Sequence, residues 1–319
     1  MSGETPHKFD TGGRTRPLPI SKTQKEQKEG FERMVQHYLE SNPLIHTDNK
    51  TSELEVRFGT NPKVARPISK IDYDNVVKQL YACGFTPDTD DGIHMLRIQN
   101  EYTDLRTGQR KMSNVRAEIM GLDLIQEYCR TNSLQKIIDM PTTIFNKLKF
   151  TQKMTATSNS GELVRKLDIE DFNFRVSYQT EQDYHVQSNF GRKIIDKWND
   201  SLKIFRSMNR VRFRHAELPI FADLTIVKTS KKTNYVVVPQ YTIQEADVFN
   251  GVGQYEVELE VDNDSVGNGT NYNTLPKLMT ALRKCIRIVL SGIQGTKFPI
   301  SYKERDGILH SYMQLINGK

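Results

Sequence analysis

The sequence predicts an α+β fold built on a closed antiparallel β-barrel of eight or more strands, with a charged interior and several helices packed outside. Two kinds of observation support this prediction. At least five strand-like stretches alternate charged residues with aliphatic or aromatic ones. Other stretches, the strongest at 275–293, have the 3.6-residue apolar spacing of helices. A closed barrel accepts charges of both signs in its interior and leaves no strand edge unpaired.

Residues 254–262 form the most regular of the alternating stretches. As a β-strand, this segment places Glu256, Glu258 and Glu260 on one face and aliphatic residues on the other. Same-face carboxylates lie about 7 Å apart and repel by about 2 kcal/mol per pair at an effective dielectric constant of about 20. Either water screens the row or cations hold it. For this strand alone, a solvated outer face is the simpler interpretation.

A second strand of the same design lies near the N-terminus. Residues 53–58 place Glu53, Glu55 and Arg57 on one face and Leu, Val and Phe on the other. Two glutamate strands that meet would supply the carboxylate oxygens that hard divalent cations prefer. The sequence therefore predicts a metal site between them, without indicating what the metal does.

Composition narrows the class of protein. The chain has 319 residues and a net charge of +6, which suits a polyanionic partner. Its three cysteines form no CxxC pair, which argues for a reducing compartment and against a zinc ribbon or a disulfide framework. No apolar run reaches the roughly 18–20 residues that span a bilayer, and no signal peptide is evident. We therefore expect an intracellular protein without a membrane partner.

The remaining elements follow from periodicity and turn residues. Ser69 suits a helix N-cap, and Gly292 and Gly295 suit the end of the last helix. Leu105 to Gly108 predicts a hairpin turn. Helical spacing recurs in five segments: 23–41, 70–83, 122–131, 192–201 and 275–293. Strand-like alternation recurs, besides the two glutamate strands, in eight: 94–104, 111–119, 145–156, 162–169, 172–181, 203–215, 220–229 and 234–238.

Basic strands complement the acidic ones. Arg210, Arg212 and Arg214 share one strand face, Arg175 lies in another alternating strand, and Lys149 belongs to a lysine-rich third. Each of these alone is more simply a solvated basic face. Taken together with the glutamate strands, they favour a closed barrel with a charged lumen. An outer-membrane barrel shares the inside-out alternation, but the helices and the missing signal peptide disfavour it.

Such a lumen can hold a metal ion bridged to a polyphosphate. Carboxylates ligate the metal, and guanidinium and ammonium groups bind phosphate oxygens. The chemistry that follows is metal-assisted hydrolysis of a terminal phosphate, in which a remaining carboxylate orients the attacking water.

These strands resemble the triphosphate tunnel metalloenzymes, in particular the RNA triphosphatases of mRNA capping in fungi and large DNA viruses. The resemblance covers about residues 51–262 in order and spacing, and it is nearest to the N-terminal module of multifunctional viral capping enzymes. Five segments carry it: 53–58, 174–177, 210–214, 222–228 and 256–260.

The resemblance implies an eight-stranded antiparallel tunnel that removes the γ-phosphate of 5′-triphosphate RNA, with Mg²⁺ or Mn²⁺ as cofactor and free NTPs as further substrates. Asp223 would position an arginine, and Glu256 or Glu258 would orient water. The implied metal ligands are Glu53, Glu55, Glu258 and Glu260. The implied catalytic groups are Glu256, Glu258, Arg212 and Asp223. The implied phosphate-binding residues are Arg57, Lys149, Arg175, Arg210 and Arg214.

We further expect a disordered leader over 1–22, one tunnel domain over 23–298 and an exit linker over 299–319 toward a further C-terminal domain. Guanylyltransferase and methyltransferase domains of the same polypeptide are the expected partners. A viral source would place the protein in the host cytoplasm or the virion.

Two other functions remain open. A tunnel hydrolase of free NTPs or inorganic tripolyphosphate would have the same lumen, although the positive charge and the strand order favour RNA. A non-catalytic docking module of a capping assembly would keep the basic strands, but it would tolerate the loss of Glu53, Glu55 and Glu260. All three glutamates are present.

Overall fold

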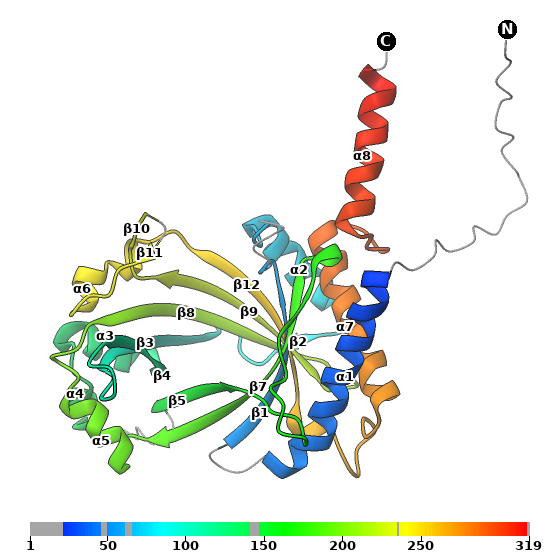
Figure 1. Cartoon of the computed structure of the whole chain (residues 1–319). Coiled ribbons are helices and arrows are strands. Elements are labelled where there is room, and N and C mark those ends of the chain that lie inside the picture. Colours follow the sequence, from blue (N-terminus) through cyan, green and yellow to red (C-terminus); the bar gives the residue numbers. More distant parts are fainter. Residues whose placement is uncertain (1–21, 46–49, 61–65, 141–146, 235, 318–319) are drawn as a thin grey trace, which may run out of the picture.

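The computed structural model describes residues 22–45, 50–60, 66–140, 147–234 and 236–317. Eight strands pair in a closed ring in the order β1-β12-β9-β8-β3-β4-β5-β7, and β7 pairs with β1 again. All of these pairings are antiparallel. The predicted closed eight-stranded antiparallel barrel is therefore confirmed (Figure 1). The ring strands are β1 (Lys50–Phe58), β3 (Ile93–Thr103), β4 (Arg110–Met120), β5 (Leu148–Thr155), β7 (Phe174–His185), β8 (Lys203–Arg214), β9 (Ile220–Thr229) and β12 (Gln254–Val261).

Short strands extend the ring. Strand β2 (Thr86–Pro87) pairs with β8, and β6 (Leu167–Ile169) pairs with β7. Strands β10 (Lys232–Thr233) and β11 (Val236–Val237) form a separate small hairpin. The run at 162–169 is thus a strand only in its last three residues. Its earlier part belongs to a loop in which Thr157 bridges to Leu163.

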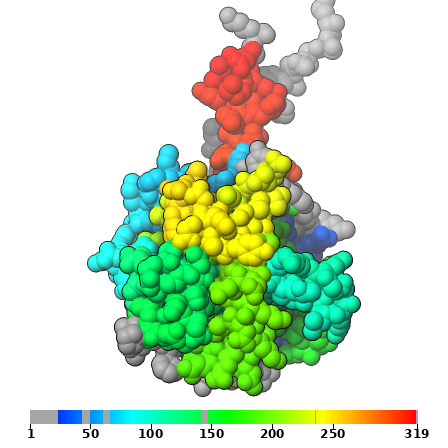
Figure 2. Space-filling view, turned by 90° about the vertical axis from the view of Figure 1, so that its left-hand side faces the viewer, coloured from blue at the N-terminus to red at the C-terminus, as the bar shows by residue number. Residues whose placement is uncertain are grey.

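Helices cover two sides of the barrel (Figure 1). One group consists of α1 (Lys22–Ile45), α2 (Lys70–Ala82) and α7 (Leu275–Gln294). The other consists of α3 (Leu122–Thr131), α4 (Leu134–Ile138), α5 (Asn189–Asp196) and α6 (Ile243–Ala246). Figure 2 looks onto this second side, where the yellow segment with β10, β11 and α6 lies against green ones.

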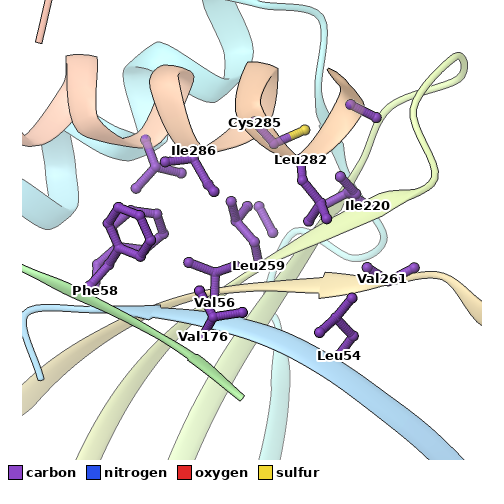
Figure 3. Close-up of a cluster of buried hydrophobic side chains, with 14 of the residues drawn as sticks. Leu54, Val56, Phe58, Val176, Ile220, Leu259, Val261, Leu282, Cys285 and Ile286 are labelled. Carbon is purple, nitrogen blue, oxygen red and sulfur yellow. The ribbon is translucent and has the colours of Figure 1, made fainter. Parts of the chain in front are cut away.

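The largest apolar core lies outside the barrel wall, not in its lumen. The apolar faces of β1, β7, β9 and β12 pack against α7 (Figure 3). Val56, Leu259 and Leu282 meet there and are almost completely buried. A second core lies between the strands β3, β4, β5 and β8 and the helices α3 to α6, around the buried Trp198. Because the core occupies the outer strand faces, the charged faces point inward.

The helix ends agree with the capping residues in the sequence. Ser69 accepts a hydrogen bond from the amide of Asp72 at the start of α2, in a capping box. Gly295 ends α7 in the left-handed conformation, with φ 64°.

The chain after α7 continues as helix α8 (Tyr302–Asn317), which projects from the body (Figure 1). The expected leader falls outside the described residues, except for its last position, Lys22. Within the described residues, no helix is long and apolar enough to cross a membrane.

Gly292 sets the close approach of α7 to α2. A Cβ at this position would lie 2.8 Å from the Cα of Val76 and 3.0 Å from its amide nitrogen. We therefore expect Gly292→Ala to push the two helices apart and to lower the free energy of unfolding by about 1–3 kcal/mol, measured by urea denaturation. Gly307→Ala in α8 is the control, because nothing lies within 4 Å of its Cβ. An equal loss of stability in both variants would contradict this account.

Candidate active site in the barrel lumen

The lumen holds a polar cavity of about 540 Å³. Strand alternation builds it, because residues between the apolar core positions fall on the inner face of each strand. Most of its lining side chains are carboxylates, guanidinium groups and ammonium groups from β1, β3, β4, β5, β7, β8 and β12. The cavity is therefore a site for charged ligands and not for apolar ones.

The two glutamate strands are neighbours in the ring. Glu55 of β1 lies opposite Glu260 of β12, and Arg57 lies opposite Glu258. Glu53, Glu55, Glu258 and Glu260, the four sequence-predicted metal ligands, all line the cavity. Strands that are far apart in sequence thus bring their carboxylates to one wall.

Lys153 lies among three carboxylates at this wall. Its ammonium nitrogen is 2.5 Å from Glu53 Oε2 and 3.7 Å from Glu55 Oε2. The same nitrogen is 3.5 Å from Glu181 Oε1 on β7. Ser177 donates a hydrogen bond of 2.8 Å to Glu55. The ammonium group therefore neutralises part of a dense cluster of negative charge.

The electrostatics of the glutamates differ along the wall. Burial, opposed by Lys153 and reinforced by Glu55, raises the pKa of Glu53 well above its usual value. Burial likewise raises the pKa of Glu260, with Arg212 opposing it. Burial alone would raise the pKa of Glu258 as well, but the neighbouring arginines outweigh it and lower that pKa. The cations around Glu258 thus compensate for the burial of its negative charge, whereas those around Glu53 and Glu260 do not fully compensate for theirs.

Three arginines from β1 and β8 pair with Glu258 and Glu256. Arg57 Nε lies 2.7 Å from Glu258, and another nitrogen of Arg57 lies 3.3 Å from Glu256. Arg210 reaches Glu258 at 3.2 Å. Arg206 forms a hydrogen-bonded ion pair with Glu256. Sequence reasoning missed Arg206, although its parity within 203–215 matches that of Arg210.

Asp223 positions two arginines at once. The side chain is 1% exposed, and it accepts two hydrogen bonds of 2.7 Å from Arg212. Arg210 lies 2.9 Å from the same carboxylate and donates to Thr225. Arg212 also donates to Glu260. Such a bidentate pair holds the plane of a guanidinium in one orientation.

A second charged cluster, on β3 and β4, also lines the cavity. The sequence-based prediction of site residues did not include it. Glu118 accepts a hydrogen bond of 2.6 Å from Arg116 and lies 2.8 Å from Arg97. Arg116 also donates to Glu181 at 2.9 Å. The signal was present in the sequence, because these residues alternate with apolar ones at 96–98 and 115–119. Arg97, Arg116 and Glu118 line the cavity, on the strands that lie across the ring from β1 and β12.

The predicted phosphate-binding residues divide into two sets. Arg57, Lys149 and Arg210 line the cavity, as does the predicted catalytic residue Arg212. Arg175 and Arg214 are not among the lining residues. The side chain of Arg175 pairs with Asp168 of β6. That of Arg214 pairs with Asp88 at 2.6 Å and is 52% exposed. Lys149 pairs with Asp183 at 2.5 Å.

The donor set at the glutamate wall fits a hard divalent cation. Burial raises the pKa values of Glu53 and Glu260, and neighbouring carboxylates raise them further. A divalent cation would relieve that repulsion. In the described part of the chain, no three acidic, histidine or cysteine side chains already converge as a metal site. Lys153 and Arg212 hold the carboxylates instead.

No family model matches the chain, and no curated protein matches its sequence. Solved structures with a similar fold include the Mimivirus capping enzyme triphosphatase, at 13% identity and a TM-score of 0.46 over 82% of this chain and 96% of that one. The S. pombe Pct1 RNA triphosphatase has 13% identity and a TM-score of 0.41, over 86% and 94%. A complex of Pct1 with the Spt5 CTD has 12% identity and a TM-score of 0.39, over 86% and 94%.

Glu118 links stability to pH. Burial alone would raise its pKa, but Arg97 and Arg116 lower it from 4.5 to about 2. Its stabilising contribution is therefore complete above pH 4.5 and disappears as the pH falls toward 2. We expect Glu118→Gln to lower the free energy of unfolding at pH 7 by about 3 kcal/mol, and the difference from wild type to shrink below pH 4.5.

Urea denaturation at pH 7, 5 and 3 measures this difference. Glu127→Gln is the control, because Glu127 pairs with the 72% exposed side chain of Arg130 and such surface pairs contribute about 0–1 kcal/mol. A pH-independent difference between Glu118→Gln and wild type would contradict the assignment.

Proposed function

We propose that this protein is a metal-dependent RNA 5′-triphosphatase, which removes the γ-phosphate of 5′-triphosphate RNA in the first step of mRNA capping. One observation carries the proposal. Inside a closed barrel, two neighbouring glutamate strands form a wall that faces arginines and lysines on the other strands. Carboxylates for a metal and cations for a polyphosphate are thereby held around one cavity.

The cations of the cavity would bind the triphosphate. Arg210 and Arg212 are fixed by Asp223, so these guanidinium groups are already held in place at the cavity and lose little entropy on binding. Arg57 and Lys149 would bind further phosphate oxygens from the other walls. Preorganised cations of this kind stabilise the negative charge of the transferring phosphoryl group.

Glu53, Glu55, Glu258 and Glu260 would hold Mg²⁺ or Mn²⁺. The bound metal would supply Lewis-acid polarisation of the phosphate oxygens. Glu256, or Glu258 where it does not ligate the metal, would orient the attacking water, whose protons pass to the phosphate product and to solvent. The oxygen of that water bonds to the γ-phosphorus as the bond to the bridging oxygen breaks, which leaves a diphosphate end and inorganic phosphate.

RNA is the preferred substrate in this proposal because the chain carries a net charge of +6 and the order of its charged strands resembles that of capping triphosphatases. A capping role would place guanylyltransferase and methyltransferase activities next to this domain. Hydrolysis of free NTPs or tripolyphosphate in the same cavity is the second candidate. Competition of triphosphorylated RNA against NTP hydrolysis distinguishes the two, because only an RNA enzyme prefers the longer polyanion.

The first test is phosphate release from γ-labelled triphosphate RNA, with Mg²⁺ and with Mn²⁺. We expect metal-dependent release by the wild type and a loss of about 10²–10³-fold in Glu260→Ala, because a metal ligand is removed. Glu26→Ala is the control, since Glu26 is exposed on α1.

No release from folded wild type with either metal would overturn the RNA triphosphatase proposal. The effect of Mn²⁺ on thermal stability tests metal binding separately from hydrolysis. Mn²⁺ should raise the Tm of the wild type, and the rise should be smaller in Glu260→Ala.

Arg212 and Arg214 provide a matched pair of arginines on one strand. Arg212 lines the cavity, whereas Arg214 pairs with Asp88 outside it. We expect Arg212→Gln to lower kcat by about 10²-fold and Arg214→Gln to change it by less than about threefold. Steady-state kinetics measure both. Equal losses would show that the phosphates reach the end of β8 and that the cavity assignment is wrong.

A further inference from the structure

One lysine at the lumen differs from all the other cations there. The arginines and lysines of the cavity wall each pair with a carboxylate, as Arg57, Lys149 and Lys153 do. Lys166 also lines the cavity. Among the residues that the structure describes, no hydrogen bond or ion pair involves its side chain, which is exposed. A positive charge without a partner at a binding cavity is available to a ligand.

Lys166 also lines a second cavity, of about 300 Å³, beside the first. This second cavity, here called the side groove, lies between α1 and the loop that joins β5 to β6. Three cationic side chains line it, those of Arg33, Arg165 and Lys166. Among the described residues that line it, one is acidic, Glu162. No carboxylate of the described residues pairs with Arg33 or Arg165, both of which are exposed. The side groove therefore has an excess of positive charge.

The side groove lies beside the point where pairing along one edge of β7 passes from β5 to β6. Strands β5 and β6 pair with the same edge of β7, because β1 occupies its other edge. The chain leaves the sheet after β5 and rejoins it as β6, which begins at Leu167. Leu167 lies opposite Val176 of β7, and Lys166 directly precedes it. Lys166 thus stands at the lumen, and the loop before it reaches outward to α1. The groove and the lumen share Lys166 as a lining residue.

The groove also offers contacts that a nucleotide chain can use. Leu163, which lines the groove, is 64% exposed and presents apolar surface there. Unpaired cations together with apolar surface suit a phosphodiester backbone with its sugars and bases.

We propose that the side groove binds the single-stranded RNA immediately behind the 5′-triphosphate. Arg33 and Arg165 contact its phosphodiesters, and Lys166 connects the groove to the triphosphate in the lumen. This inference rests on the proposed function. It assigns the preference for RNA over free nucleotides to residues outside the charged wall of the barrel.

The test compares Arg33→Gln/Arg165→Gln with wild type on two substrates, a 5′-triphosphate RNA of about 20 nucleotides and ATP. We expect KM for the RNA to rise by about tenfold, and its salt dependence to weaken by a slope of about 0.7 per lost phosphate contact. Hydrolysis of ATP should stay unchanged. The control is Arg192→Gln/Lys193→Gln, which removes two exposed cations of α5 on the other side of the barrel (Figure 1).

Equal effects on RNA and ATP, no effect on RNA, or a larger effect in the α5 control would each overturn the groove assignment. Fluorescence anisotropy with a labelled 5′-hydroxyl RNA gives a second readout that needs no hydrolysis. We expect Arg33→Gln/Arg165→Gln to weaken this binding by about tenfold. If the wild type hydrolyses no triphosphate at all, the proposed enzyme function fails, and the anisotropy alone decides whether the groove binds RNA.

Discussion

The structure depends on mutual neutralisation of charges inside the barrel. Burying one unpaired carboxylate or guanidinium has a large desolvation penalty. Here the cost is reduced because opposite charges face each other across the strands. Asp223 is 1% exposed between Arg210 and Arg212, and Lys153 lies among three carboxylates. An open sheet would leave these rows facing water, so the closed ring and the charged cavity require each other.

This charged interior determines where the rest of the chain packs. A strand has two faces, and when one is charged, only the other can contribute to an apolar core. The core therefore forms between the barrel and the helices, in two clusters. Helix α7 contributes most of its buried face to the first cluster, against the backs of the glutamate strands (Figure 3). The same alternation that builds the site thus also holds the helices in place.

The sequence predicted which strand face each side chain occupies better than it predicted the ion-pair partner of that side chain. The period-two pattern assigned Glu53, Glu55 and Glu258 to the lumen, because burial of Leu and Val fixes the register of each strand. It did not show which cation meets which carboxylate, since that depends on pairing between distant strands. Arg175 has the expected parity, yet Asp168 of a short neighbouring strand pairs with it. The roles of the site residues in binding metal or phosphate stay predictions.

The ion pairs also limit how a ligand can bind. A cation that binds a phosphate either keeps its ion pair with a carboxylate or gives up that ion pair for the phosphate. Arg212 pairs with both Asp223 and Glu260, so it can release Glu260 and remain oriented by Asp223. Glu260 would then be free for the metal. In the proposed mechanism, metal and triphosphate would therefore favour each other's binding, because each would take up one half of an ion pair that exists in the free protein. In the proposed mechanism, the carboxylate that positions Arg212 and the carboxylate that would bind the metal are two different residues, Asp223 and Glu260.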